Sequence, residues 1–391
     1  MPSGVDLGAG VVTLATFLPL SFDPSVRSSR AFEAGIRMAL DDANAAGGVD
    51  GCTFDLVVAD GGFDPEDSLA AAPLLTEEVG PYAVLEQFTA STYAPDVWRV
   101  FSAAGVISWD HSSGTLPQTA DVYLVDPLQS EQIRVCVDHL AASDARRLAV
   151  VGPASNPVYT SPFAPAGLQS AVSGIETTEV PLHPFSVSPL DDPTVSAASV
   201  ADAVEAILGS DPDAVVINVM YPTLLEVVAA LRNAGFTGPV CTTRAGAVAN
   251  ANSDAFVGEP ADATDGLLAA TDMALPDLDD PGVDAWRERA SAYTGPGAEE
   301  ASSQFSLNAY YSTLAFLDVF DRLDGDLSHA SFEAAAESTG EDPLDYGAIG
   351  RVQCGEGPAG HACGRGAAIV RYDAATNLWS HVEGFVLPAD N

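Results

Sequence analysis

The sequence predicts an α/β protein of two lobes, each a doubly wound parallel sheet with helices on both faces. Three observations lead to this fold class. Short apolar runs alternate with longer segments of helical periodicity along most of the 391 residues. The alternation passes through two successive series, which meet near residues 124–128. The run DAVVINVM at 213–220 is apolar almost throughout, as expected of a strand buried on both faces.

The first series begins with an apolar strand at 11–18 (VVTLATFL) and a helix, FEAGIRMALDDANAA, whose apolar residues repeat at helical spacing. Gly47 and Gly48 end this helix, because glycine readily adopts the positive φ found after a helix. FDLVVAD is the second strand.

The next helix begins at Asp64-Pro65, which combines a capping side chain with proline at the first helical position. Pro73 lies inside this helix and should kink it. A third strand (YAVLEQF), a third helix (APDVWRVFSAAG) and a short fourth strand (VISW) complete the series.

The second series contains the helices SEQIRVCVDHLAAS, SVADAVEAILGS and TLLEVVAALRNAG, and the strands RRLAVVG, DAVVINVM and GPVCTT. A long amphipathic helix, SQFSLNAYYSTLAFLDVFDRL, then returns the chain to the first lobe, and antiparallel strands follow it. We expect residues 1–125 with 275–350 to form one lobe, and 126–274 with 351–391 the other. Ligands of such open sheets bind at the carboxyl ends of the strands.

The charge balance excludes two classes of function. Fifteen basic residues, all arginine, stand against 55 acidic ones, which gives a net charge of −40. Binding to nucleic acid or to an anionic membrane needs clustered cations, which this chain lacks. The acidic surface is explained by solubility and salt adaptation, or alternatively by docking of a basic partner. No run of 18 apolar residues is present, so we expect no membrane span.

Five cysteines leave at least one unpaired. Cys354 and Cys363 enclose a Gly/Pro-rich loop and are predicted to form a local disulfide. The alternative is a zinc site made by this pair with His361, although no fourth ligand is obvious. The pairing of Cys52, Cys136 and Cys241 is left open.

The order of several motifs resembles the branched-chain amino-acid (Leu/Ile/Val) solute-binding proteins of ABC transporters, which have the type I periplasmic-binding-protein fold. FLPLSFDP is similar to the family's Pro-Leu-x-Gly loop, and LVVADGGFDPEDSLAA to its Asp-x-x-x-Asp-Pro segment. The helix end DDANAAGGVDG, the Ser-rich loop TASTYAP and the segment GVISWDHSS also have counterparts. Each motif alone is weak, whereas the ordered set covers nearly the whole chain.

The resemblance implies two lobes joined by three crossings of a hinge, with a small-molecule ligand clamped in the cleft between them. It also implies a monomeric, non-enzymatic protein that delivers its ligand to an ABC transporter permease, without cofactor, metal or catalytic residues. We expect a periplasmic or extracellular protein, free or lipid-anchored, whose signal peptide is absent from this chain. A sensing domain of the same fold and an α/β enzyme are the alternatives. The chain contains no G-x-S-x-G or P-loop motif.

In this family, loops after the third and fourth strands hold a ligand carboxylate with backbone N–H groups and hydroxyls. The matching residues here are Thr89, Ala90, Ser91 and Thr92 in the first loop and Ser112 in the second. The second lobe of the family supplies aromatic side chains, which correspond to Tyr159 and Tyr221. An ordinary cap, turn or rim residue is the alternative for each of them.

Two departures from the family pattern bear on the ligand. Amino-acid binders of this family carry an acidic residue at a position that Arg244 or Ala245 occupies here, and an arginine there favours a carboxylate over an ammonium group. Trp109, Asp110 and His111 stand where the family has proline and small residues. Trp109 is a candidate to stack on the ligand, and Asp110 to bind an ammonium group. Alternatively, Asp110 pairs with His111 or Arg244, or caps a turn.

Overall fold

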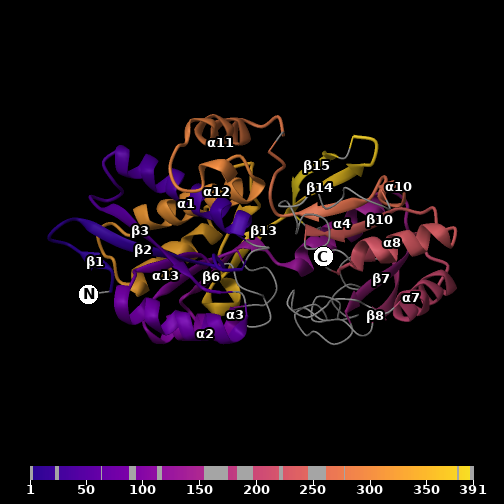
Figure 1. The fold of residues 1–391 in the computed structure, drawn as a ribbon, viewed down its shortest axis with the longest axis horizontal. Coiled ribbons are helices and arrows are strands. Elements are labelled where there is room, and N and C mark those ends of the chain that lie inside the picture. Colours follow the sequence, from indigo (N-terminus) through magenta and orange to yellow (C-terminus); the bar gives the residue numbers. More distant parts are fainter. Residues whose placement is uncertain are drawn as a thin grey trace. The chain divides into compact units, whose positions relative to one another are not determined.

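A computed structural model describes most of the chain (Figure 1). The described residues are 3–22, 26–62, 64–87, 94–111, 117–153, 175–182, 197–219, 223–244, 261–276, 278–376 and 378–387. The chain divides into two compact units: unit 1 comprises Met1–Leu128 and Pro276–Arg365, and unit 2 comprises Gln129–Leu275 and Gly366–Asn391. The chain therefore passes between the units three times.

The first two crossings fall close to the positions expected from the sequence. The third falls after Arg365, whereas the sequence predicts it after residue 350. The reason is that β12 (Arg351–Val352) and β13 (Ala362–Arg365) join the sheet of unit 1, where β13 pairs in parallel with β6 (Val122–Pro127).

Unit 1 contains an eight-stranded sheet in the order β1-β2-β4-β5-β6-β13-β12, with β3 also paired to β2. Its remaining strands are β1 (Val5–Asp6), β2 (Val11–Leu18), β3 (Thr53–Asp60), β4 (Ala83–Gln87) and β5 (Ile107–Asp110). Its helices are α1 (Val26–Ala45), α2 (Pro65–Leu74), η2 (Leu75–Val79), α3 (Ala94–Ala103), α11 (Pro281–Ala292), η4 (Ala298–Glu300), α12 (Gln304–Asp321), α13 (His329–Glu337), η5 (Ser338–Gly340) and α14 (Gly357–Gly360). Strands β2 to β6 and β13 are parallel, as predicted.

Local sequence signals explain where α2 begins and how it ends. Asp64 caps the helix by accepting a hydrogen bond from the backbone N–H of Asp67, and Pro65 is its first residue. The predicted effect of Pro73 appears as a change of helix type, because α2 passes into the π-helix η2 immediately afterwards. Gly80, with φ of 57°, ends this turn in the left-handed conformation.

Helices cover both faces of the unit 1 sheet. On one face, Phe17 and Val84 pack against Phe101 of α3 in a hydrophobic cluster that α2 also joins. On the other face, α12 contributes Phe320, whose ring contacts Tyr82 and Phe54. The sheet is thus buried on both sides, which explains the apolar runs in the sequence.

Unit 2 contains a seven-stranded sheet in the order β15-β14-β11-β10-β9-β7-β8. The strands are β7 (Arg147–Pro153), β8 (Glu176–Leu182), β9 (Ala214–Ile217), β10 (Val240–Thr243), β11 (Leu268–Thr271), β14 (Ala367–Asp373) and β15 (Leu378–Val386). The helices are α4 (Gln129–Ala142), α7 (Ala197–Gly209), α8 (Thr223–Asn233) and α10 (Ala261–Thr264). Strands β7 to β11 are parallel, and β14 and β15 add an antiparallel edge.

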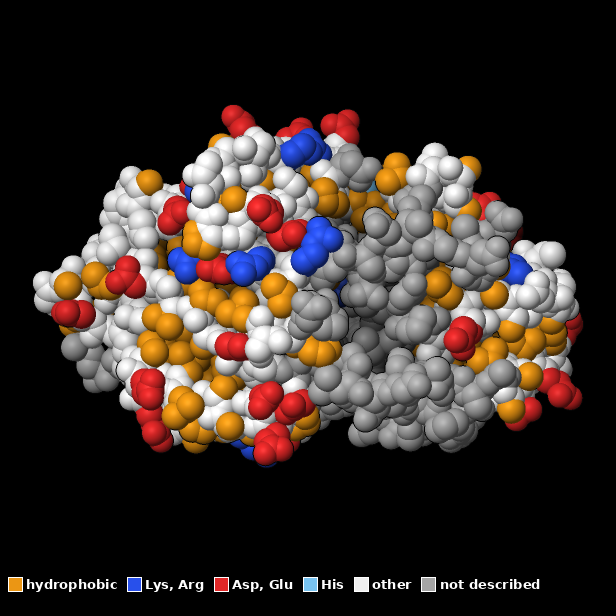
Figure 2. Space-filling model, in the orientation of Figure 1, with side chains coloured by type: hydrophobic (Ala, Val, Ile, Leu, Met, Phe, Trp, Pro, Cys, Tyr) orange, Lys and Arg blue, Asp and Glu red, His pale blue; other side chains and the backbone are white. Residues whose placement is uncertain are grey.

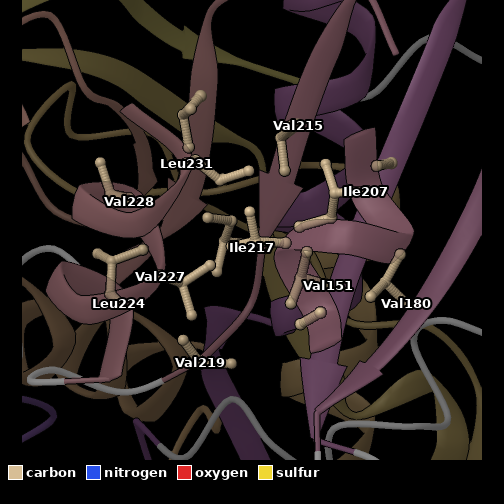
Figure 3. Packing of buried hydrophobic residues seen from close by; sticks show 14 of the residues in the cluster. Val151, Val180, Ile207, Val215, Ile217, Val219, Leu224, Val227, Val228 and Leu231 are labelled. Atoms are coloured by element: carbon tan, nitrogen blue, oxygen red, sulfur yellow. The ribbon is translucent and has the colours of Figure 1, made fainter. Parts of the chain in front are cut away.

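The core of unit 2 is formed mainly by aliphatic side chains (Figure 3). Val215 and Ile217 point from β9 toward Leu231 of α8, within a cluster that Ile207 of α7 also joins. Val216, between them, belongs to a second cluster on the opposite face, with residues of α4. This alternation confirms the prediction of a strand buried on both faces within the 213–220 run, although the strand itself covers only Ala214–Ile217.

Two disulfides and one free cysteine account for the five cysteines. Cys354 and Cys363 form the predicted local disulfide. This pairing contradicts the alternative zinc site, because a disulfide has no thiolates to bind the metal. A second disulfide joins Cys136 of α4 to Cys241 of β10, over a sequence separation of 105. Cys52 is buried and unpaired, and burial raises the pKa of its thiol.

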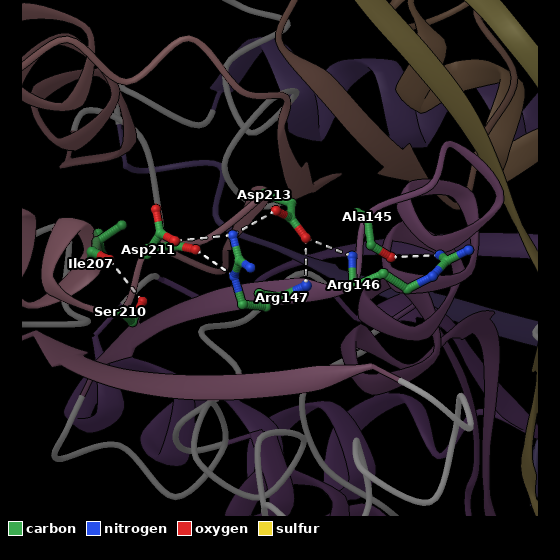
Figure 4. Close-up of polar contacts among 7 residues, drawn as sticks. All are labelled: Ala145, Arg146, Arg147, Ile207, Ser210, Asp211 and Asp213. Carbon is green, nitrogen blue, oxygen red and sulfur yellow. Dashed lines mark hydrogen bonds and ion pairs between the residues drawn. The ribbon is translucent and has the colours of Figure 1, made fainter.

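Polar contacts at the amino end of β7 tie neighbouring strands of unit 2 together (Figure 4). The carboxylate of Asp213 accepts hydrogen bonds from the backbone N–H groups of Arg146 and Arg147, both at 2.9 Å. It also lies 3.0 Å from the guanidinium of Arg147, which bonds the backbone oxygen of Asp211 as well. The backbone N–H groups, more than the arginine charges, lower the pKa of Asp213. These contacts align the starts of β7 and β9, at the end of the sheet opposite the expected site.

Acidic side chains are spread over the visible face of the protein rather than gathered in one patch (Figure 2). Several arginines lie beside them, as in the pairs Arg27–Glu300 and Arg289–Asp42. On this face, the dispersed acidic side chains favour the solubility interpretation over a dedicated docking patch. None of the helices in the described ranges combines the length and apolar character needed to span a membrane.

Candidate functional site

Many of the predicted ligand residues lie outside the described residues. These are Thr89, Ala90, Ser91, Thr92, Ser112, Tyr159 and Tyr221. Trp109, Asp110 and His111 are described in unit 1, and Arg244 is described in unit 2. All four lie at what we call the carboxyl edge of a sheet, where the carboxyl ends of its parallel strands meet.

Three buried carboxylates lie at the carboxyl edge of unit 1. Glu86, Asp110 and Asp126 lie in the neighbouring strands β4, β5 and β6, and each is at most 1% exposed. Glu86 has φ of 54°, in the left-handed region that a residue with a Cβ rarely adopts. It occurs where the pairing of β4 with β2 shifts register. Such irregularities often redirect side chains at functional sites.

His111 lies among these carboxylates and completes what we call the acid–histidine cluster: Glu86, Asp110, His111 and Asp126. Its Nδ1 is 2.9 Å from Oε2 of Glu86 and 3.6 Å from Oδ1 of Asp110. Burial alone would lower the pKa of His111, but the hydrogen bond with Glu86 and the three negative charges outweigh it and raise the pKa. The ring stacks on Phe32, with centroids 4.6 Å apart.

Asp110 pairs within unit 1. One oxygen accepts a hydrogen bond of 2.8 Å from the indole N–H of Trp98, and the other faces His111. Burial raises the pKa of Asp110 to about 6, although His111 and Trp98 act in the opposite direction. Of the alternatives left open by the sequence, the structure shows the pairing of Asp110 with His111.

Trp109 is a core residue, so we do not retain it as a candidate to stack on a ligand. Its side chain is 0% exposed, and its indole N–H donates to the backbone oxygen of Ser312 at 2.9 Å. Its ring contacts Tyr123, Phe316 and Phe332. Successive residues of a strand point to opposite faces, and Trp109 points toward α12 and α13.

Arg244 lies at the carboxyl edge of unit 2, where it directly follows β10. Its Nε is 3.3 Å from Oδ1 of Asp272, which directly follows the neighbouring strand β11. The Asp272 side chain is fully buried, and that of Arg244 is 16% exposed. The arginine expected to attract a ligand carboxylate is therefore already beside an acidic side chain of its own unit.

A polar network surrounds this ion pair. Gln132 of α4 accepts a hydrogen bond from the backbone N–H of Arg244 and donates one to Asp272. Asn218, directly after β9, accepts a hydrogen bond of 2.8 Å from the hydroxyl of Thr243. The first turns of α4 and the ends of three parallel strands thus place amide, hydroxyl and charged groups at one edge.

Four further polar residues at these edges are not among the site residues predicted from the sequence: Glu86, Asp126, Asn218 and Asp272. A signal was available for all four, because each is a polar residue at the end of an apolar strand run: YAVLEQ, VYLVD, AVVIN and LAATD. A polar side chain in such a position belongs to the carboxyl edge of the sheet.

Two surface hollows lined by described residues lie away from these carboxyl edges. One is lined by Gly105, Leu327 and His329, next to the amino ends of strands in unit 1. Another, in unit 2, is lined by Pro239, Gly266 and other residues at the amino ends of β10 and β11. Both are at the opposite end of the parallel strands from the polar edges described above.

The family can now be assigned. Residues 12–377 match the family model described as periplasmic binding protein. The chain belongs to the periplasmic binding protein family. This match covers both units and confirms the family resemblance drawn from the ordered motifs. No curated protein sequence matches the chain.

Solved structures of ABC transporter substrate-binding proteins share the fold. The one from Sphaerobacter thermophilus has a TM-score of 0.73 and 15% identity, with 97% of this chain and 99% of that chain covered. The fatty acid ABC transporter substrate-binding protein from Thermomonospora curvata has a TM-score of 0.72 and 16% identity, with 100% of this chain and 95% of that chain covered. The Desulfitobacterium hafniense protein in complex with Leu has a TM-score of 0.69 and 15% identity, with 95% of this chain and 100% of that chain covered. At these identities the similarity shows the fold alone.

Proposed function

We propose that this periplasmic binding protein captures a small carboxylate-bearing solute, an amino acid or a related acid, outside the cytoplasm and delivers it to an ABC importer. The carrying observation is the family match over residues 12–377. Each unit also has a carboxyl edge that carries buried polar side chains. In open α/β sheets this edge is where ligands bind.

The ligand class follows from the chemistry of the two edges. In unit 1, the carboxylates around His111 raise the pKa of its imidazole, so the edge combines acidic side chains with one basic side chain. In unit 2, Arg244 and Asp272 balance each other's charge. Both edges carry acidic and basic side chains, and a zwitterionic amino acid fits this chemistry better than a dianion or a polyamine does.

Two structural relatives support a carboxylate. One is a fatty acid transporter protein and another was solved in complex with Leu. The two ligands share a carboxylate and differ in the rest of the molecule. We therefore assign the carboxylate as the common element and leave the side-chain preference to experiment.

The test is a thermal-shift screen of amino acids, aromatic acids, fatty acids, amides, sugars and polyamines, followed by calorimetric titration of each hit. A true ligand at 100 times its Kd stabilises the protein by about 2.7 kcal/mol. Recovery of the ligand unchanged by mass spectrometry distinguishes binding from turnover. Stabilisation by sugars or polyamines alone would contradict the proposal.

Variants locate the ligand. Tyr221→Ala and Ser91→Ala should each weaken binding at least about 10-fold, the effect of losing one good contact of about 1.4 kcal/mol. Trp379→Ala, at the opposite end of the unit 2 sheet from its carboxyl edge, is the matched control for loss of an aromatic side chain, and it should leave the affinity unchanged. Equal affinity in all three variants would refute the assignment of the site.

A further inference from the structure

Two glutamates and a buried histidine converge in unit 1, away from its carboxyl edge. Glu333 and Glu337 belong to α13, and His361 lies in the loop closed by the Cys354–Cys363 disulfide. One ligand atom from each of the three residues lies within 4.8 Å of the other two. Nε2 of His361 is 3.5 Å from Oε1 of Glu337. We call these three residues the Glu333–Glu337–His361 cluster.

The imidazole of His361 is buried without hydrogen bonds. Its residue is 0% exposed, and neither ring nitrogen has a hydrogen-bond partner. An imidazole in this state has lost its hydrogen bonds to water without gaining one from the protein, which is unfavourable. The backbone is held by a 2.8 Å bond from the N–H of Leu124 to the His361 oxygen, and Tyr123 stacks on the ring at 4.4 Å. The ring is therefore fixed with Nε2 toward Glu337.

Without a bound cation, the negative charges of the two glutamates are in unfavourable positions. They lie four residues apart on one face of α13, where like charges repel. Glu337 is the last residue of the helix, where the helix dipole disfavours a negative charge. Among the ion pairs of the described residues, none joins an arginine to either glutamate. A bound cation would offset each of these costs.

We propose that the Glu333–Glu337–His361 cluster binds a divalent transition-metal ion, with Zn²⁺ the best match. The ligands are Nε2 of His361 and one carboxylate oxygen from each glutamate. Zn²⁺ is bound by such nitrogen and oxygen donors, whereas Mg²⁺ and Ca²⁺ prefer oxygen donors alone. Three protein ligands leave one position of a tetrahedral ion for water.

The surroundings of the cluster suit a structural role. Oε1 of Glu337 also accepts a 2.8 Å bond from the backbone N–H of Gly357, so the loop and the helix end are already joined. Both glutamates are partly exposed, which gives an ion access from the solvent side. The metal would fasten the disulfide-closed loop to α13. This site replaces the sequence expectation of no metal, and it uses His361 without the two cysteines.

The experiment titrates Zn²⁺ into chelator-treated full-length protein at high ionic strength, which screens weak binding to the acidic surface. We expect one Zn²⁺ per chain by calorimetry and a raised melting temperature. Glu337→Gln and Glu333→Gln should each lower the Zn²⁺ affinity more than about 10-fold. Loss of a residue that only contacts a metal ligand already costs about 10-fold, and loss of a ligand should cost more. The matched control, Glu341→Gln, replaces an exposed glutamate just beyond α13 and should leave the affinity unchanged.

A second readout identifies the histidine. Co²⁺ in place of Zn²⁺ should give the visible absorption of a four-coordinate site, and His361→Gln should abolish it. Because that variant changes a buried residue, circular dichroism checks its fold, and the partly exposed Glu333→Gln provides an independent test. Absence of stoichiometric binding, or several weak sites that respond equally to Glu341→Gln and Glu337→Gln, would overturn the proposal.

Discussion

Arg244 Nε lies 3.3 Å from Asp272 Oδ1, and the two residues follow neighbouring parallel strands at the carboxyl edge of unit 2. Asp272 is fully buried, and its oxygen atoms face Arg244 and Gln132. The arginine therefore has two roles, since it compensates a buried charge of its own unit while it remains part of the proposed ligand site.

The first prediction is that Arg244→Gln destabilises unit 2 by about 3 kcal/mol, because it leaves the buried carboxylate of Asp272 without its cation. Urea unfolding at neutral pH measures this loss. Under the proposed function, the same variant also weakens binding of the carboxylate ligand.

The double variant Arg244→Gln/Asp272→Asn separates the two roles. It removes both charges, so most of the lost stability should return while ligand affinity stays low. If the double variant loses more unfolding free energy than the two single variants lose together, the ion pair is not the reason for the destabilisation by Arg244→Gln.

The second prediction concerns Asp110. Its pKa is raised to about 6 from 3.8, so the folded protein holds this proton more tightly than the unfolded chain does. The resulting stabilisation is present below about pH 4 and is lost as the pH rises through about 6. The shift of about two pKa units corresponds to about 3 kcal/mol.

Asp110→Asn should remove this pH dependence while its side-chain oxygen still accepts the hydrogen bond from Trp98. The measurement is the difference in unfolding free energy between the variant and the wild type, from about pH 4 to about pH 7. The difference should shift in favour of the variant as the pH rises. A difference independent of pH would show that Asp110 titrates normally.

The third prediction ranks the two disulfides. In the chain-entropy account, the Cys136–Cys241 link, with a separation of 105, is worth about 5 kcal/mol, and the Cys354–Cys363 link, with a separation of 9, about 3 kcal/mol. The Cys136→Ala/Cys241→Ala variant should therefore lose more stability than Cys354→Ala/Cys363→Ala does. Denaturant unfolding of both variants tests the order, and the reverse order would exclude loop closure as the main source of the stabilisation.

The sequence predicts helices and strands well where residues close in the chain determine where they begin and end. Asp64 and Pro65 mark the start of α2, and the apolar run before Asn218 marks β9. Hydrophobic periodicity and caps act within a few residues, so one sequence is enough to locate them. The third crossing was misplaced because it depends on which distant strand β13 pairs with.

The site was harder to predict because its partners are far apart in sequence. Nothing near Arg244 shows that Asp272 will compensate its charge, and nothing near Trp109 shows that α12 and α13 will enclose it. Local sequence shows which residues of a strand share a face. Which helices cover that face depends on segments about two hundred residues away in the chain. The family resemblance indicates which positions of the chain correspond to ligand-binding positions, but it does not predict the contact of Arg244 with Asp272 or the packing of Trp109.

The last prediction tests the contact between α1 and α12. A Cβ added at Gly35 would lie 2.3 Å from the backbone oxygen of Ser306 and 2.8 Å from the Cβ of Ala309. Alanine favours a helix over glycine by about 1 kcal/mol, whereas overpacking of a core costs about 1–3 kcal/mol. Because the closest contact is backbone, which cannot rotate away, we expect the clash to dominate and Gly35→Ala to be destabilising.

Gly209, the last residue of α7, provides the matched control, since a Cβ there would meet nothing within 4 Å. Gly209→Ala should be neutral or slightly stabilising, because only the helix preference remains. Unfolding of both variants under the same conditions isolates the cost of the steric clash. A Gly35→Ala variant as stable as Gly209→Ala would mean that α1 and α12 can separate at little cost, and that the close approach of the two helices is not required for the stability of unit 1.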